Sequence, residues 1–297
     1  MATTEYQNSH RLVHEVTLDH VAENLKPESV LLPMIPTVPI PNSTQTRTLR
    51  KKGELFRQTL AENTQGQIQE YTEDFTALNS IKQVVIVENT VEAIDFSTEP
   101  ALPMVQAVEA AKAFAVGMDE DIAALFNTAT SSITAAAPNL TLLEVLAAAL
   151  NVNVSTRGHS VKRDGGLVFV GSHKQYFDAV DVGALNPATG ANLNIYGNAA
   201  SNIPAANNDS VNVAPTGFRA NIAGLDFYST EILDDDGTNY FGAVFNPKRA
   251  FVGMYSNDVK MLTDEDVLFF KTSKGMYLYS DFAVHYNEAL CLVQSAL

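Results

Sequence analysis

A long segment with helical periodicity constrains the fold of this chain more than any other feature. It runs from Pro100 to Asn127, and its apolar side chains recur at steps of three and four residues: Leu102, Val105, Val108, Ala111, Ala115, Met118, Ile122 and Leu125. This spacing places them on one face of an α-helix. The predicted helix is about 25 residues or roughly 37 Å long, about twice the mean for globular proteins. We call it the spine helix. A long amphipathic helix also occurs in ordinary α/β proteins, so the segments around it decide the interpretation.

A proline-rich apolar segment lies near the N-terminus. Residues 26–41 read KPESVLLPMIPTVPIP, and their prolines exclude a helix and favour extended or polyproline II backbone. The apolar residues between the prolines include Leu31, Leu32, Met34 and Ile35. An extended segment cannot bury these side chains on itself. It either straps the chain's own core or lies along a neighbouring copy, and the sequence leaves both alternatives open.

The next segment, residues 43–76, is polar and carries charges of both signs. Its basic residues are Arg47, Arg50, Lys51, Lys52 and Arg57, and its acidic residues are Glu54, Glu62, Glu70, Glu73 and Asp74. With few large apolar side chains, it predicts a long hairpin or loop with little core of its own. Such loops in compact domains are usually functional or disordered. A basic run is most often a solvated surface, but both signs on one projecting loop also suit salt bridges to a neighbouring copy.

Composition excludes several functional classes. The 297 residues carry a net charge of -15, which disfavours tight binding to a phosphate backbone. A single cysteine, Cys291, excludes an intrachain disulfide and fits a reducing compartment. No run of about 18 apolar residues occurs and the first residues lack a secretory pattern, so we expect neither a membrane span nor export.

Candidate catalytic or metal-binding groups are each explained better by structural roles. No phosphate-binding loop, nucleophile elbow or HExxH motif occurs. His10 and His14 could share a helix face, but surface histidines are the more economical interpretation. Residues 234–239 fit a D-G hairpin turn better than a calcium loop. Residues 119–121 are expected to form a solvated acidic patch, and Cys291 a buried thiol. We therefore expect no catalytic residue, metal or cofactor.

The remaining chain alternates short strands and helices. After a strand in 78–96 and the spine helix, we expect a helix over 141–150 capped by Asn139 or Thr141, a buried strand at 167–171 and a helix from His173 capped by Ser172. Residues 183–214 predict loops. Later strands are expected at 222–233, 240–246, 250–254, 267–271, 276–279 and 282–294, with a turn at 273–275.

The order of these segments resembles that of the major capsid proteins of tailed phages, which have the Hong Kong 97-type fold. The resemblance rests on the charged loop, the passage IKQVVIVENTVEAIDF into the spine helix, LTLLEVLAAAL, GLVFVGSHKQYFDAV and the late segments IAGLDFYSTEIL and GMYLYSDFAVHYNEALCLV. It implies an α+β fold with an N-terminal arm (1–42), an extended loop (43–77), a peripheral domain with the spine helix (78–139), an axial domain (140–255) and return strands of the peripheral domain (256–297).

The resemblance also implies a structural role without enzymatic activity. Members form pentamers and hexamers that tile an icosahedral shell around double-stranded DNA, which they enclose without sequence-specific binding. A separate scaffolding protein, a portal and a decoration or cement protein are the implied partners. The implied locations are the virion and, during assembly, the host cytoplasm. No cofactor, metal or membrane is implied.

Specific inter-subunit contacts follow from the same resemblance. In the extended loop they are expected at Arg47, Arg50, Lys51, Lys52, Glu54 and Arg57, and in the arm at Leu31, Leu32, Met34 and Ile35. Two alternatives remain: the shell of an encapsulin-type compartment, and a soluble α/β enzyme of unknown chemistry.

Overall fold

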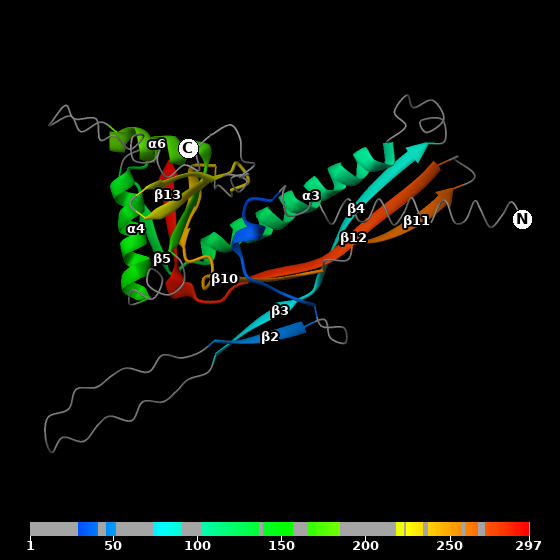
Figure 1. Cartoon of the computed structure of the whole chain (residues 1–297), viewed down its shortest axis with the longest axis horizontal. Helices are drawn as coiled ribbons and strands as arrows, with labels where there is room; N and C mark the ends of the chain where they lie inside the picture. The colour runs from blue at the N-terminus through cyan, green and yellow to red at the C-terminus, as the bar shows by residue number, and fades with distance from the viewer. Residues whose placement is uncertain are drawn as a thin grey trace, which may run out of the picture.

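Two β-sheets and a long helix organise the molecule (Figure 1). The structure is a computed structural model, and it describes residues 29–40, 46–51, 74–90, 102–136, 139–156, 166–184, 218–222, 224–233, 237–256, 259–266 and 271–296. Statements about structure below refer to these residues. The presence of both α-helices and β-strands confirms the predicted α+β class.

One sheet is long and narrow, and we call it the long sheet. Among the described residues its path is β1-β10-β12-β11, with β4 also paired to β12. The bounds of its strands are β1 (Thr37–Val38), β4 (Ile81–Thr90), β10 (Phe251–Tyr255), β11 (Lys260–Asp266) and β12 (Lys271–Val284). β12 is antiparallel to β4, β10 and β11, whereas β1 runs parallel to β10.

The predicted turn at 273–275 is wrong. These residues lie inside the continuous strand β12, because β4 pairs with it on one edge and β11 on the other. Gly275, the residue that suggested a turn, lies opposite Ile86 of β4 and Leu262 of β11. Pairing on both edges outweighs the local turn preference of the sequence.

The second sheet has six strands within the described residues, in the order β5-β13-β9-β6-β8-β7. Their bounds are β5 (Ser131–Thr134), β6 (Leu167–Gly171), β7 (Phe218–Ile222), β8 (Leu225–Ser229), β9 (Asn239–Phe245) and β13 (Leu290–Ala296). All five residues of β6 are buried, as its uninterrupted apolar sequence predicts. We call this sheet, together with helices α4 (Leu142–Ser155) and α6 (His173–Ala184), the compact lobe.

The predicted D-G hairpin is also wrong. Gly237 has the left-handed φ of +74° that a turn there requires, but the strands on its two sides are not neighbours. β8 and β9 pair with opposite edges of β6. A two-residue turn joins adjacent antiparallel strands, so the acidic segment before Gly237 connects strands that are separated by β6.

Helices α4 (Leu142–Ser155) and α6 (His173–Ala184) accompany the six-stranded sheet (Figure 1). Thr141 caps α4 through a reciprocal capping box with Glu144, which confirms one of the two predicted caps. Ser172 accepts a hydrogen bond of 3.1 Å from the backbone N–H of Gln175, as the predicted cap of α6 requires.

The spine helix is confirmed as α3 (Leu102–Ala124), a helix of 23 residues. It ends in a short 3-10 helix, η2 (Leu125–Thr128). Of the predicted apolar face, Ala111, Ala115, Met118 and Ile122 are buried, whereas Val105 is 44% exposed. The buried face starts instead at Ala107 and includes Phe114, so it is rotated relative to the predicted face over the first turns.

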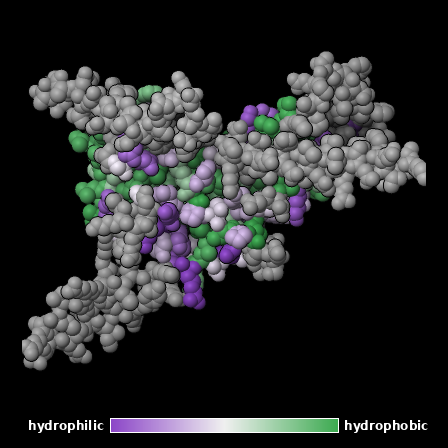
Figure 2. Space-filling view, viewed as in Figure 1, coloured by the Kyte–Doolittle hydropathy of each residue, from purple (hydrophilic) through white to green (hydrophobic). Residues whose placement is uncertain are grey.

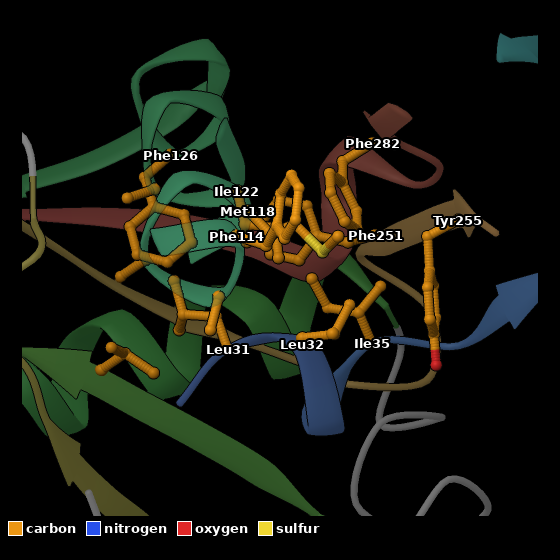
Figure 3. Close-up of a cluster of buried hydrophobic side chains, with 14 of the residues drawn as sticks. Leu31, Leu32, Ile35, Phe114, Met118, Ile122, Phe126, Phe251, Tyr255 and Phe282 are labelled. Atoms are coloured by element: carbon orange, nitrogen blue, oxygen red, sulfur yellow. The ribbon is translucent and has the colours of Figure 1, made fainter. Parts of the chain in front are cut away.

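The main hydrophobic core lies where α3, the N-terminal segment and both sheets meet (Figure 3). Phe126, Phe245 and Phe251 pack ring to ring there, with centroids 5.1 to 5.8 Å apart. A second core, which includes Phe169 and Phe227, lies within the compact lobe. Shared aromatic packing between the two sheets joins them into one structure.

Two strands pair in a different sheet from the one that their position in the chain suggests, while the domain boundaries themselves stay a prediction. β10 was expected in the axial domain (140–255), but it pairs within the long sheet. β13 was expected among the return strands (256–297), but it pairs with β5 and β9 in the six-stranded sheet. The chain therefore crosses between the sheets once more than the sequence indicates, through the 3-10 helix η3 (Asn287–Ala289).

Candidate assembly surfaces

The charged loop begins and ends in a two-stranded hairpin of β2 (Thr46–Lys51) and β3 (Asp74–Asn79). The hairpin projects away from both sheets (Figure 1). At its far end Lys51 forms an ion pair of 3.2 Å with Asp74. The backbone N–H of Phe75 and the Lys51 ammonium both lower the pKa of Asp74. This exposed ion pair closes the hairpin where the rest of the loop leaves it.

The base of the hairpin is anchored on the long sheet. Leu78 is fully buried in a small cluster with Val252 and Met254 of β10. Thr76 Oγ1 lies 3.1 Å from His285 Nδ1, and the N–H of Asn79 donates to Asp281 Oδ2 at 2.5 Å. Burial, and to a lesser degree the charge of Lys51, lower the pKa of His285. A fixed base gives the projecting hairpin a defined direction.

The predicted contact residues of the loop divide into two groups. Arg47, Arg50 and Lys51 lie on β2, whereas Lys52, Glu54 and Arg57 lie outside the described residues. Arg47 Nη1 donates to the carbonyl of Pro39 at 2.6 Å, and Lys51 pairs with Asp74. These two cations therefore already have partners within the chain, and contact with a neighbouring copy stays a prediction.

The predicted contact residues of the arm pack against the core of their own chain. Leu31, Leu32 and Ile35 are buried in the main core against α3 and β10 (Figure 3). Met34 is partly buried and packs against this core. The backbone turns through η1 (Leu32–Met34) and then adds β1 to the long sheet. Of the two alternatives left by the sequence, these residues fit the strap over the chain's own core. Contact of this arm with a neighbouring copy stays a prediction.

A buried carboxylate holds this strap on α3. Asp119 is fully buried and accepts hydrogen bonds from Ser29 Oγ at 2.5 Å and from the N–H groups of Val30 at 2.7 Å, Leu31 at 3.1 Å and Leu32 at 3.3 Å. The N–H of Leu32 also donates to Ser29 Oγ at 3.0 Å. We call this group the Asp119 clasp. The carboxylate satisfies the N–H groups that open η1, as an N-terminal cap does.

The predicted solvated acidic patch is therefore wrong for Asp119, while Glu120 and Asp121 are exposed. Burial raises the pKa of Asp119, and the hydrogen bonds from Ser29 and from the N–H groups partly offset that rise. The sequence held a usable signal: Asp119 follows Ala115 by four residues and precedes Ile122 by three. A carboxylate at buried-face spacing needs donors from another segment.

Among the described residues, one face of the long sheet is left uncovered, and we call it the open face. Val85 and Val87 pack toward the core below α3, while on the opposite face Val84 is 47%, Ile86 71% and Leu262 61% exposed. Ile86 and Leu262 flank Gly275 in register, where an added Cβ would meet nothing nearer than the Leu262 carbonyl at 3.9 Å. Alternation along the strands thus produces an apolar surface with a shallow centre.

The groups considered for chemistry do not converge. Within the described residues no three His, Cys, Asp or Glu side chains are placed to hold a metal ion. Cys291 is fully buried, as predicted, and burial raises its pKa to about 11. None of the helices that the structure describes is long and apolar enough to cross a membrane. His10 and His14 lie outside the described residues.

Comparison with known proteins places this fold. No family model and no curated sequence matches the chain. Among solved structures, the capsid of a native GTA particle is 13% identical, with a TM-score of 0.64 over 91% of both chains. A structure from Microbacterium phage Oxtober96 is 12% identical, with a TM-score of 0.64 over 89% of this chain and 90% of that one. The virus-like particle of Pyrococcus furiosus is 9% identical, with a TM-score of 0.58 over 94% and 98%.

Nearly full coverage of both chains defines the class of fold. The chain has the Hong Kong 97-type fold of tailed-phage major capsid proteins, as the order of its segments predicted. The arm, the projecting hairpin, the long helix and the two sheets described above are the parts that this fold brings together.

Proposed function

We propose that the chain is the structural subunit of a phage capsid and assembles with copies of itself into a closed shell. The observation that carries this proposal is the match to capsid structures over about nine-tenths of both chains. The proposed role is structural, and no residue is assigned to catalysis.

The physical form of the subunit supports this role. A projecting hairpin is costly for an isolated protein, because ordering the segment loses conformational entropy. An apolar open sheet face is also costly, because contact between apolar surface and water is unfavourable. Ile86 and Leu262 are examples of such surface. Contacts with several neighbours can recover these costs, and weak contacts accumulate in a closed lattice.

The finer proposal is a shell of pentamers and hexamers around double-stranded DNA. The net charge of -15 suits a container whose inner surface does not hold the DNA phosphates tightly. A scaffolding protein, a portal and a decoration or cement protein complete the proposed set of partners. The proposed locations are the virion and the host cytoplasm during assembly.

An encapsulin-type compartment is the second candidate. The particle from Pyrococcus furiosus matches over 98% of its own chain, but its TM-score of 0.58 is below the 0.64 of the GTA capsid. The likeness therefore does not favour a compartment over a capsid. A soluble enzyme has less support, because the fold matches capsid structures and the described residues offer no group of three His, Cys, Asp or Glu that could hold a metal ion.

Sedimentation velocity and negative-stain microscopy of the purified protein, alone and with its scaffolding protein, test the proposal. We expect rings or closed shells. A stable monomer or dimer under both conditions would contradict a shell function. Shells that contain a co-purified enzyme in place of DNA, when isolated from the native source, would favour the compartment.

A further inference from the structure

The outer face of α4 carries an apolar stripe without a partner among the described residues. Leu143, Leu150 and Val154 are 77%, 61% and 68% exposed, and Ala147 between them is also exposed. Steps of four, three and four residues place these four side chains on one face of the helix. We call this set the α4 stripe. Figure 2 shows hydrophobic residues along the edge of the molecule where α4 lies in Figure 1.

The opposite face of α4 explains why the stripe is not part of the core. Val145, Ala148, Ala149 and Val152 are buried and pack with β6, β8 and β13 in the core of the compact lobe. Only that face of α4 packs in the core, and amphipathic helices normally have a polar outer face. Here the outer face is apolar as well, and packing within the subunit does not explain its apolar residues.

The stripe is also uncharged. Glu144 is the one charged residue between Leu142 and Ser155. Its carboxylate accepts hydrogen bonds from the N–H groups of Ala136 at 2.9 Å and Thr141 at 2.8 Å. Burial raises the pKa of Glu144, but these hydrogen bonds together lower it below its usual value. Glu144 therefore acts in the N-terminal cap of α4, and its position is about 100° around the helix from Leu143 of the stripe.

Charge identifies the occupant of the stripe. Two copies of a chain with a net charge of -15 repel each other, and the repulsion is smallest where the contacting surfaces are neutral. Nucleic acid and anionic lipid require Lys or Arg, and α4 contains neither. A second copy of this chain is therefore the partner whose charge fits the stripe best.

The size of the stripe favours a shell over an isolated dimer. Full burial of one aliphatic side chain removes roughly 60–120 Å² of apolar surface from water. Three such side chains supply roughly 250 Å², against about 800 Å² per partner in a standard interface. One contact of this size does not hold a dimer, but it can add to the contacts that each copy makes in a lattice.

We propose that the α4 stripe packs against a neighbouring copy of this chain within the assembled shell. This inference rests on the proposed function and deepens it, because it assigns one inter-subunit contact to four named side chains. The contact joins different surfaces of the two copies, as ring assemblies require.

Charge placed on the stripe tests the proposal. We expect Leu150→Glu to leave the subunit folded with an unchanged circular dichroism spectrum, and to lower the yield of shells at least tenfold. Ser155→Glu is the matched control: it puts the same charge on an exposed position of the same helix, about 100° from Val154. We expect this variant to assemble at the wild-type yield.

A cross-link provides a readout that does not depend on the tolerance of the fold for glutamate. A photoreactive benzoylphenylalanine at position 150 of assembled shells should give a covalent dimer with peptides of this chain on both sides, and dissociated subunits should give none. Wild-type yield for Leu150→Glu, or cross-links in shells that remain within one subunit, would overturn the α4 contact and leave the shell function intact. A wild-type chain that forms no shells would overturn both.

Discussion

The compact lobe and the long sheet differ in how completely the chain covers its own strands. In the compact lobe every residue of β6 is buried, and helix α4 packs on the sheet. In the long sheet, α3 and the N-terminal strap cover one face, while Ile86 and Leu262 remain exposed on the other. Among the described residues, both faces of β6 are covered within the subunit, whereas one face of the long sheet is left exposed.

The largest expected effect is on the compact lobe. Phe169 is fully buried, and its ring centroid lies 5.1 Å from that of Phe227. Phe169→Ala should lower the free energy of unfolding by about 4 kcal/mol, because it removes a large side chain from a closed core. Denaturant unfolding followed by circular dichroism measures this loss. As a control, Phe75→Ala on the hairpin, where Phe75 is 52% exposed, should change stability by about 0.5 kcal/mol or less.

A second, smaller effect is expected where the strap covers the long sheet. Asp119→Ala leaves the buried Ser29 hydroxyl and the N–H groups of Val30 and Leu31 without their acceptor, while the N–H of Leu32 keeps Ser29 Oγ. We expect a loss of about 3 kcal/mol, since each buried unsatisfied group costs about 1–3 kcal/mol. Hydrogen exchange at Val30 and Leu31 should accelerate in the same variant. Glu120→Ala, at the next and exposed position, should do neither; equal effects of the two changes would refute the clasp.

The clasp also predicts a dependence of stability on pH. Burial raises the pKa of folded Asp119 above 3.8. The stabilisation from this group is therefore complete below its unfolded-state pKa and is lost as pH rises through the folded-state pKa. Relative to Asp119→Asn, which does not titrate, the wild type should lose stability as pH rises from about 4. Urea unfolding at a series of pH values measures the difference, and a gain of the wild type over the variant with rising pH would have the wrong sign.

The smallest effect on stability is expected for the open face of the long sheet. This variant tests most directly whether that face differs from the covered strands of the compact lobe. Ile86→Thr combined with Leu262→Thr should change the free energy of unfolding by about 0.5 kcal/mol or less, because both side chains are exposed and threonine suits a strand. If the open face is covered in the shell, the same variant should lower the yield of particles in sedimentation. A loss of several kcal/mol in the isolated subunit would show that this face is already covered within the chain.

The sequence predicts local structure well where one segment determines it. The spacing of apolar residues predicts α3 and the apolar run LVFVG predicts β6. Thr141 is one of two predicted caps of α4, and Ser172 is the predicted cap of α6. The order of these segments predicted the fold class. Each of these features depends on residues that are close together in the chain, so the sequence pattern contains the necessary information.

The failures share one physical cause, which is contact between distant segments. The turn expected at 273–275 became part of β12 because strands at 81–90 and 260–266 pair on both its edges. Asp119 was taken for a surface acid because its donors lie 87 to 90 residues away. The membership of β13 in the second sheet depends on pairing with Ser131–Thr134. Single-sequence periodicity carries no information about such partners.

Strand β12 has a mechanical consequence. It has 14 residues, which corresponds to a rod of roughly 48 Å. β4 and β11 flank the half that begins at Lys271, and β10 flanks the half that ends at Val284. The change of flanking strands falls between Tyr277 and Ser280. Bending stress applied to the tip of this rod by a neighbour concentrates at that junction, where the sheet changes its cross-section. We therefore expect the subunit to bend most readily at this junction, which lies next to the anchored base of the hairpin, where the N–H of Asn79 donates to Asp281.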